Sequence, residues 1–130
     1  MSIDPRVDIG HVHLKVADIG RALEFWHGVL GFDVTQRLGD QAAFLSAGGY
    51  HHHVGINTWA GVGAPPPPAD SVGLEYFTIL LPSEVDLDTE KRQAMDAGLV
   101  WEEKDSGLLL HDPSGNGVLL TMEEALVRRR

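Results

Sequence analysis

The stretch Ile9-Gly10-His11-Val12-His13-Leu14-Lys15-Val16 alternates apolar and polar side chains and runs into a helical pattern that ends at Gly31. About 65 residues later, Leu74-Glu75-Tyr76-Phe77-Thr78-Ile79-Leu80-Leu81 begins a second unit, whose helix ends at Gly98. Period-two alternation is typical of a half-buried strand, and a glycine commonly ends a helix. A repeat with one period indicates two copies of one supersecondary unit.

Each unit is predicted to be β-α-β-β-β. In the first, we expect strands at 9–16, 32–38, 42–47 and 51–58, with Asp18 capping the helix. In the second, we expect strands at 74–81, 100–105, 107–111 and 117–122, and a helix from Asp86 or Asp88 to Ala97. The expected fold class is therefore α+β, with two paired modules that form a curved mixed sheet around a cleft.

The domain organisation follows from the same pattern. We expect one domain over 1–130, with a first module at 8–60 and a second at 72–124. The segment 61–71 contains four consecutive prolines, Pro65–Pro68, which favour an extended linker and prevent strand pairing.

Composition limits the classes of function. The 130 residues are 43% hydrophobic, contain no cysteine and carry a formal net charge of −9. An acidic chain is a poor nucleic-acid binder, and no apolar run has the ~20 residues of a membrane-spanning helix. Without thiolates, a metal must be held by nitrogen or oxygen ligands. We expect a cytoplasmic protein whose partner is a small molecule.

Strand parity predicts where polar side chains gather. The helix of each module must cover an apolar face, which in the first strand carries Val12, Leu14 and Val16. The opposite face then receives two pairs of histidines, and the matching face of the second module receives tyrosine and leucine. We expect a cleft with the following lining: His11, His13, His51, His53, Tyr76 and Leu119, and Trp59 beside it for a flat ligand.

Several motifs carry a resemblance to a known family. Gly-His-Val-His-Leu-Lys-Val-Ala-Asp at 10–18 and Asp-Pro-Ser-Gly-Asn-Gly at 112–117 resemble the vicinal oxygen chelate superfamily, which contains glyoxalase I, bleomycin-resistance proteins and extradiol dioxygenases. Tyr-His-His-His-Val-Gly-Ile-Asn-Thr-Trp at 50–59, the proline-rich linker and Phe-Thr-Ile-Leu-Leu-Pro at 77–82 look like catechol-2,3-dioxygenase-type members. The resemblance implies the paired-module fold and a site for a chelating small molecule.

The resemblance also implies a metal site of two histidines and one glutamate. Its first ligand corresponds to His11, with His13 as the alternative, and His53 matches the family's acid–base histidine. The second ligand falls at Tyr76 and the glutamate at Leu119, so two expected ligands are replaced. A divalent metal (Fe, Mn, Ni or Zn) held by His11 and His53 is therefore expected to be weakly bound or absent.

Three functions follow from these residues. The first is binding of, or altered chemistry on, a small aromatic or oxygenated molecule, with the ring-cleaving triad degenerate. The second is a metal-dependent dioxygenase or glyoxalase-like enzyme that uses His11 and His53 as ligands, or His53 as the catalytic proton carrier. The third is sequestration of a cationic drug, as the resemblance to bleomycin-resistance proteins implies. The superfamily also implies homodimerisation as one assembly.

Overall fold

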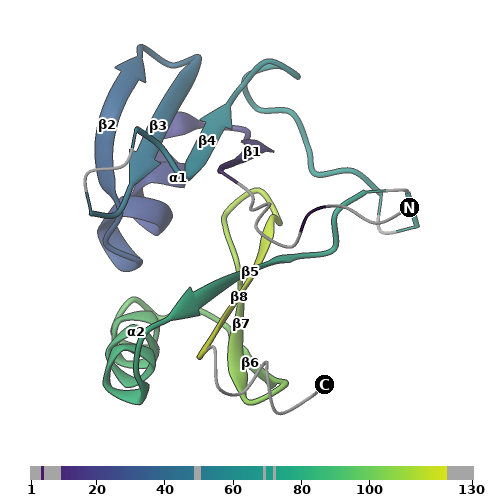
Figure 1. The fold of residues 1–130 in the computed structure, drawn as a ribbon. Coiled ribbons are helices and arrows are strands. Elements are labelled where there is room, and N and C mark those ends of the chain that lie inside the picture. Colours follow the sequence, from purple (N-terminus) through teal and green to yellow (C-terminus); the bar gives the residue numbers. More distant parts are fainter. Residues whose placement is uncertain (1–3, 5–9, 49–50, 69, 72, 123–130) are drawn as a thin grey trace.

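Each half of the chain folds into a four-stranded mixed sheet with a helix packed beside it (Figure 1). The computed structural model describes residues 4, 10–48, 51–68, 70–71 and 73–122. The first half contains β1 (Val12–Lys15), α1 (Ile19–Leu23), the π-helical turn η1 (Glu24–Val29), β2 (Asp33–Leu38), β3 (Ala42–Ser46) and β4 (Val54–Asn57). The second half contains β5 (Phe77–Leu81), α2 (Glu84–Asp96), β6 (Glu102–Lys104), β7 (Gly107–His111) and β8 (Gly117–Met122). We refer to β1–β4 and β5–β8, with their helices, as module one and module two.

The two modules share one topology, which confirms the predicted repeat and the α+β class. Their strand orders are β1-β4-β3-β2 (sheet A) and β5-β8-β7-β6 (sheet B). In sheet A, β1 pairs with β4 in parallel, and in sheet B, β5 pairs with β8 in parallel. None of the helices in the described ranges has the length and apolar character that crossing a membrane requires.

The register corrects the internal alignment of the two copies, in which the sequence repeat pairs His11 with Tyr76 and His53 with Leu119. Val12 lies opposite Val54 in sheet A, as Phe77 lies opposite Val118 in sheet B. The residue of module one that corresponds to Leu119 is therefore Gly55, not His53. The pairing of His53 with Leu119 was two residues out because strand parity, on which it rested, is unchanged by a shift of two residues.

Helix caps agree with the prediction in module one and differ in module two. The Asp18 side chain accepts a hydrogen bond from the Arg21 backbone N–H at 2.9 Å, as expected of an N-cap. In module two the cap is Ser83, whose Oγ accepts from the Asp86 backbone N–H, so α2 starts at Glu84. Asp86 thus lies in the first turn, where its charge is favourable, rather than capping the helix.

β4, the fourth strand of module one along the chain, is shorter than predicted. β4 begins at Val54, so the three histidines at 51–53 precede the strand instead of alternating across it. The Thr35 hydroxyl donates to the His51 carbonyl at 3.0 Å, and Thr35 lies where the β2–β3 register shifts. This contact holds the segment near β2, outside the regular alternation of a strand.

One hydrophobic core spans both modules. Trp26 is 0% exposed, and its indole stacks on the Phe77 ring with centroids 5.9 Å apart. The predicted core positions Leu14 and Val16 are buried in the same cluster, as is Phe25. The shared core means that folding of one module contributes to the stability of the other.

The turn at 112–117 fastens module two to module one. Asp112 is buried; its Oδ2 accepts from Trp26 Nε1 at 3.1 Å, and its Oδ1 accepts from the backbone N–H groups of Ser114 and Asn116. The Ser114 hydroxyl accepts from the Ala17 backbone N–H, and the Asn116 side chain donates to the Lys15 carbonyl, both at 2.9 Å. The turn motif therefore has a structural use at the end of β1.

Candidate ligand cavity and histidine cluster

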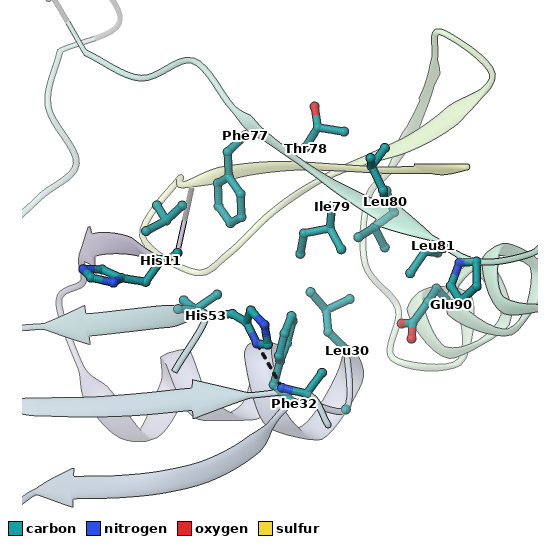
Figure 2. Close-up of a pocket in the computed structure, with 17 residues that line it drawn as sticks. His11, Leu30, Phe32, His53, Phe77, Thr78, Ile79, Leu80, Leu81 and Glu90 are labelled. Carbon is teal, nitrogen blue, oxygen red and sulfur yellow. Dashed lines mark hydrogen bonds between the residues drawn. The ribbon is translucent and has the colours of Figure 1, made fainter. Parts of the chain in front are cut away.

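A cavity of about 700 Å³ lies between the two modules (Figure 2). Its volume falls in the range of small-molecule sites, about 300–1,000 Å³. Its lining comes from β1, the segment after η1, β4, β5, α2 and β8. The lining residues are Gly10, His11, Val12, Leu30, Gly31, Phe32, Ala47, His53, Val54, Phe77, Thr78, Ile79, Leu80, Leu81, Pro82, Glu90 and Leu120.

Most of the cavity wall is apolar. Figure 2 shows Phe77 and Ile79 of β5 facing Leu30 and Phe32 of module one across the space. Val12 belongs to the strand face that the sequence assigned to the helix, and Val12, Phe77 and Ile79 all pack against the core. The cavity therefore lies at an edge of the apolar interface between modules, where the packing is incomplete.

Two imidazoles bring polar atoms to the cavity. His11 precedes β1 and His53 precedes β4, so both enter beside paired strands (Figure 2). His53 Nδ1 accepts a hydrogen bond from the Ala47 backbone N–H at 3.2 Å. Because that nitrogen acts as the acceptor, the neutral ring carries its proton on Nε2 and can donate it to an oxygen atom.

Glu90 of α2 supplies a carboxyl group at the far end of the cavity from His11 (Figure 2). Burial, and after it the charge of the neighbouring Asp86, raise the pKa of Glu90 to about 7. Among the described residues its buried Oε2 has no hydrogen-bond partner. A carboxyl group with this pKa is partly protonated near neutral pH, so it can donate or accept a hydrogen bond.

Sequence reasoning missed Glu90, although a signal was present. Leu87, Glu90 and Ala94 are spaced i, i+3 and i+7, and Leu87 and Ala94 are the buried residues of α2. Residues with this spacing share one face of a helix. An acidic residue within the buried stripe of a helix is a candidate for a functional position.

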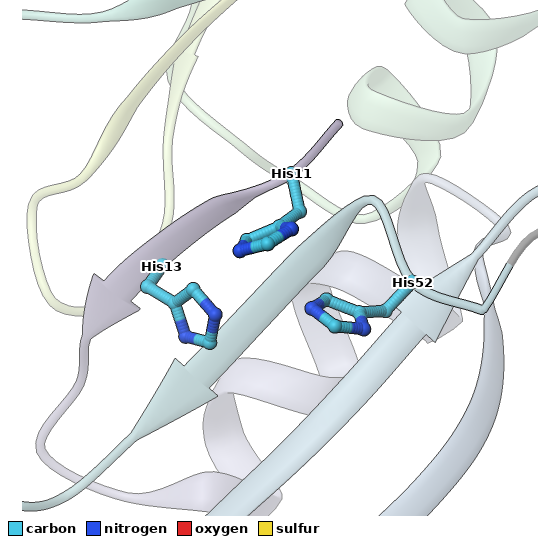
Figure 3. A group of neighbouring side chains, drawn as sticks. All are labelled: His11, His13 and His52. Carbon is cyan, nitrogen blue, oxygen red and sulfur yellow. The ribbon is translucent and has the colours of Figure 1, made fainter. Parts of the chain in front are cut away.

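A second polar group, the histidine cluster, consists of His11, His13 and His52 on the outer face of sheet A (Figure 3). One ring nitrogen from each can be chosen so that all lie within 4.8 Å of one another. The rings of His11 and His52 have centroids 4.5 Å apart, and those of His11 and His13 are 4.8 Å apart. Burial lowers the pKa of His52, and its histidine neighbours lower it further.

The other predicted site residues lie apart from the cavity. The Tyr76 ring lies under the Lys104 ammonium, with 5.6 Å from Nζ to the ring centroid. Leu119 is 3% exposed and pairs with Thr78. Trp59 is 68% exposed, and Tyr76, Leu119 and Trp59 are all absent from the cavity lining. The structure thus brings His11 and His53 to one cavity without Tyr76, Leu119 or Trp59.

His13 and His51 belong to the surroundings of the histidine cluster rather than to the cavity lining. His51 Nδ1 lies 3.0 Å from His52 Nδ1, so one of these nitrogens donates to the other. The sequence did not single out His52, because a continuous strand over 51–58 would have placed it on the opposite face. The end of β4 at Val54 removes that constraint.

The residues present do not fit the iron triad that the family resemblance implies. Leu119 has no donor atom, and its side chain is buried in sheet B. Tyr76 offers a phenol in place of an imidazole, and its ring lies under the Lys104 ammonium. The resemblance also implies a tyrosine that assists catalysis near position 109, and this chain has the buried Leu109 there.

Comparisons with known proteins agree with this fold. The model of the Glyoxalase/Bleomycin resistance protein/Dioxygenase superfamily matches residues 8–120. The chain therefore belongs to that superfamily, the vicinal oxygen chelate group. It is 45% identical over 106 residues to Catechol-2,3-dioxygenase of Bacillus subtilis (strain 168), a match that covers 81% of this chain and 37% of that protein. The chain thus spans well under half of the length of this relative.

Solved structures of the family share the fold at low sequence identity. A glyoxalase I of Leishmania major superposes with a TM-score of 0.72 at 16% identity, covering 95% of this chain and 91% of that one. Lactoylglutathione lyase from Agrobacterium tumefaciens gives a TM-score of 0.66 at 20% identity, covering 90% and 94%. These similarities establish the architecture, two four-stranded mixed sheets with few helices.

Proposed function

We propose that the chain binds a small aromatic, oxygenated molecule in the cavity between its modules, and that it does so without the ring-cleaving metal triad. The observation that carries this proposal is the cavity itself, about 700 Å³ with apolar walls and a few polar groups. Small-molecule sites commonly combine these two features. Similarity to a catechol-2,3-dioxygenase supports a phenolic ligand class.

The arrangement of groups suits a ring with adjacent oxygens. The Phe32 and Phe77 rings offer aromatic surface, against which a flat ligand can stack or pack edge to face. The His53 Nε2–H and the His11 ring can hydrogen-bond to phenolic oxygens, and Glu90 can bind a further polar substituent. Replacement of the triad positions by Tyr76 and Leu119 supports binding, or altered chemistry, rather than ring cleavage.

The test is calorimetric titration of the purified chain with catechol, with cyclohexane-1,2-diol as a control of the same size that lacks the aromatic ring. We expect saturable binding of catechol and at least about 10-fold weaker binding of the diol, one to two lost aromatic contacts being worth that much. Ile79→Trp should fill the cavity and abolish binding, because Ile79 faces its interior. Val85→Trp is the matched control, since Val85 is exposed on α2 and lies outside the lining.

Two results would contradict the proposal. One is equal catechol binding by the wild type and Ile79→Trp. The other is iron-dependent formation of the yellow ring-opened product from catechol, which would show that a ring-cleaving centre is retained. Including a cationic glycopeptide in the same titrations distinguishes the drug-sequestering alternative, which predicts binding of the glycopeptide and not of catechol.

A second candidate function is a metal-dependent enzyme that uses His11 and His53. It is favoured by one observation, that both imidazoles line the same cavity. It predicts that His53→Ala removes metal uptake, whereas His53→Ala in a binding protein weakens only the organic ligand. Metal content of the tag-free protein, measured by elemental mass spectrometry for wild type and variant, separates these outcomes.

A further inference from the structure

We propose that His11, His13 and His52 form a zinc site on the outer face of sheet A, built within module one alone. The set shares only His11 with the ligands that the family resemblance implies. It needs no residue of module two and no organic ligand. The zinc site shares His11 with the cavity but does not rest on the proposed function, so either can fail while the other stands.

The arrangement of the three rings is close to that around a zinc ion bound by three histidines. The three ligand nitrogens lie within 4.8 Å of one another. A tetrahedral zinc ion with Zn–N bonds of ~2.0–2.1 Å requires its ligand nitrogens to be about 3.4 Å apart. Side-chain rotation must bring the most distant pair closer by about 1.5 Å, and His11 and His13 are exposed and have room for it.

An unsatisfied atom marks the site. His52 Nε2 is buried from solvent and has no hydrogen-bond partner among the described residues. A buried polar atom without a partner is unfavourable, and the cost disappears when a ligand occupies it. Figure 3 shows the His52 ring directed towards His11 and His13, so an ion held by these two rings would take Nε2 as its third ligand.

His51 is placed to fix the tautomer of His52. Their Nδ1 atoms are 3.0 Å apart. When His52 Nδ1–H donates to His51 Nδ1, the His52 proton resides on Nδ1 and the Nε2 lone pair is left for a metal. Histidine ligands usually donate their other ring N–H in this way, which holds the ring in position. His51 is therefore a positioning residue.

The strand beneath the cluster accommodates the imidazoles. Gly55 lies opposite His13 in the β1–β4 register. A Cβ atom on Gly55 would lie 2.7 Å from His13 Nδ1 and Cε1, closer than such contacts allow. The absence of a side chain at Gly55 is therefore what allows the His13 ring to lie over β4 and reach the cluster.

Zinc is the ion that this donor set suits. The three ligands are imidazoles, which bind Zn²⁺ well, and the chain has no cysteine. Three histidines leave a fourth position open for water or an anionic ligand. His11 also lines the cavity, so the zinc site and the cavity share one residue.

The test is calorimetric titration of tag-free full-length protein with ZnCl₂, together with Co²⁺ as a spectroscopic probe of coordination. We expect one Zn²⁺ per chain and the visible absorption of four-coordinate Co²⁺. His13→Ala and His52→Ala should each weaken Zn²⁺ binding at least about 100-fold, since loss of an outer partner alone costs about 10–100-fold. His111→Ala, at the exposed end of β7, is the matched control and should bind like the wild type.

Variants at His51 test the positioning role. His51→Ala should weaken Zn²⁺ binding about 10-fold. His51→Asn should restore much of it, because the amide oxygen can accept from His52 Nδ1–H, a rescue that a purely structural role would not give. Circular dichroism of each variant checks that it is folded.

Three outcomes would overturn the site. They are absence of saturable Zn²⁺ uptake by the wild type, wild-type affinity in folded His13→Ala, and an equal loss of affinity in His53→Ala and His13→Ala. A loss confined to His53→Ala, with His13→Ala unaffected, would assign the metal to the His11–His53 pair in the cavity instead.

Discussion

The outer faces of sheets A and B have the same backbone plan and opposite chemistry. On sheet A, the strand residues Gly55 and His13 pair, and the imidazole lies over the glycine. On sheet B, the corresponding pair is Leu119 and Thr78. Leu109 and Leu119 of sheet B are both buried, whereas His13 is exposed. The comparison shows that the repeat fixes the register, while single residues at equivalent positions decide whether a face can hold a polar site.

The largest expected effect concerns the connection between the modules, and its target is Asp112. Asp112→Ala removes the acceptor of the buried Trp26 Nε1–H and of two backbone N–H groups in the turn. We expect a loss of about 3–4 kcal/mol in the free energy of unfolding, since each orphaned buried donor costs about 1–3 kcal/mol. Urea denaturation measures it.

The same experiment tests whether the modules are energetically separate. Because one core spans both, tryptophan fluorescence and far-ultraviolet circular dichroism should report a single coincident transition. Two separated transitions, with only one shifted by Asp112→Ala, would show that the two halves fold independently. Asp112→Asn retains one acceptor oxygen and should lose less than Asp112→Ala.

An intermediate effect on stability is expected when a residue of the outer face of sheet B replaces its counterpart on sheet A. Gly55→Leu gives sheet A the leucine that sheet B has at the equivalent position, Leu119. The Cβ atom of the new side chain would overlap the His13 ring. We expect a destabilisation of about 1–3 kcal/mol, typical of overpacking, and loss of Zn²⁺ binding as His13 is displaced. Thermal unfolding and zinc titration are the measurements. Zn²⁺ affinity unchanged in Gly55→Leu would show that His13 does not need the space above Gly55.

The smallest expected effect on stability concerns Glu90. This residue of module two lines the same cavity as the imidazoles of His11 and His53 in module one. The folded-state pKa of about 7 lies above the ordinary 4.5, so the folded protein binds more protons between these values. The free energy of unfolding should therefore fall as pH rises through this window. Glu90→Gln should remove that part of the pH dependence and be more stable than wild type above pH 7.

We expect this difference to be about 1 kcal/mol, below the full linkage value, because the side chain is partly exposed and solvent screens its charge. Urea denaturation below pH 4.5 and above pH 7 measures it. Parallel pH profiles for wild type and Glu90→Gln would show that the Glu90 carboxyl is not perturbed. Asp86→Asn, which removes the neighbouring charge, should give a smaller change in the same direction.

Much of the fold was predictable because it depends on local pattern. Alternation in β1 identified Leu14 and Val16 as core, and the cap at Asp18 fixed the start of the first helix. The start of α2 was misplaced because Ser83 and Asp86 are both good caps, and the choice between them depends on the path of the chain after β5.

The candidate site was less predictable because it depends on where strands end. His11 and His53 were singled out from the sequence and both line the cavity. His52 and Glu90 were missed, the first because β4 starts only at Val54 and the second because it lies far along the chain in α2. Period-two alternation does not determine where a strand ends, nor which residues far apart in the sequence come close together in the fold.

The sequence by itself determined the repeat, the register-setting apolar faces and the absence of donor atoms at Leu119, since side-chain identity and alternation are local properties. Tertiary structure decided the grouping of the polar side chains. The hydrogen bond from Thr35 to the His51 carbonyl holds the segment before β4, and from there the His52 ring faces His11 and His13. Packing of β5 against module one, not any motif, left the cavity open, because its shape depends on how two distant surfaces fit together.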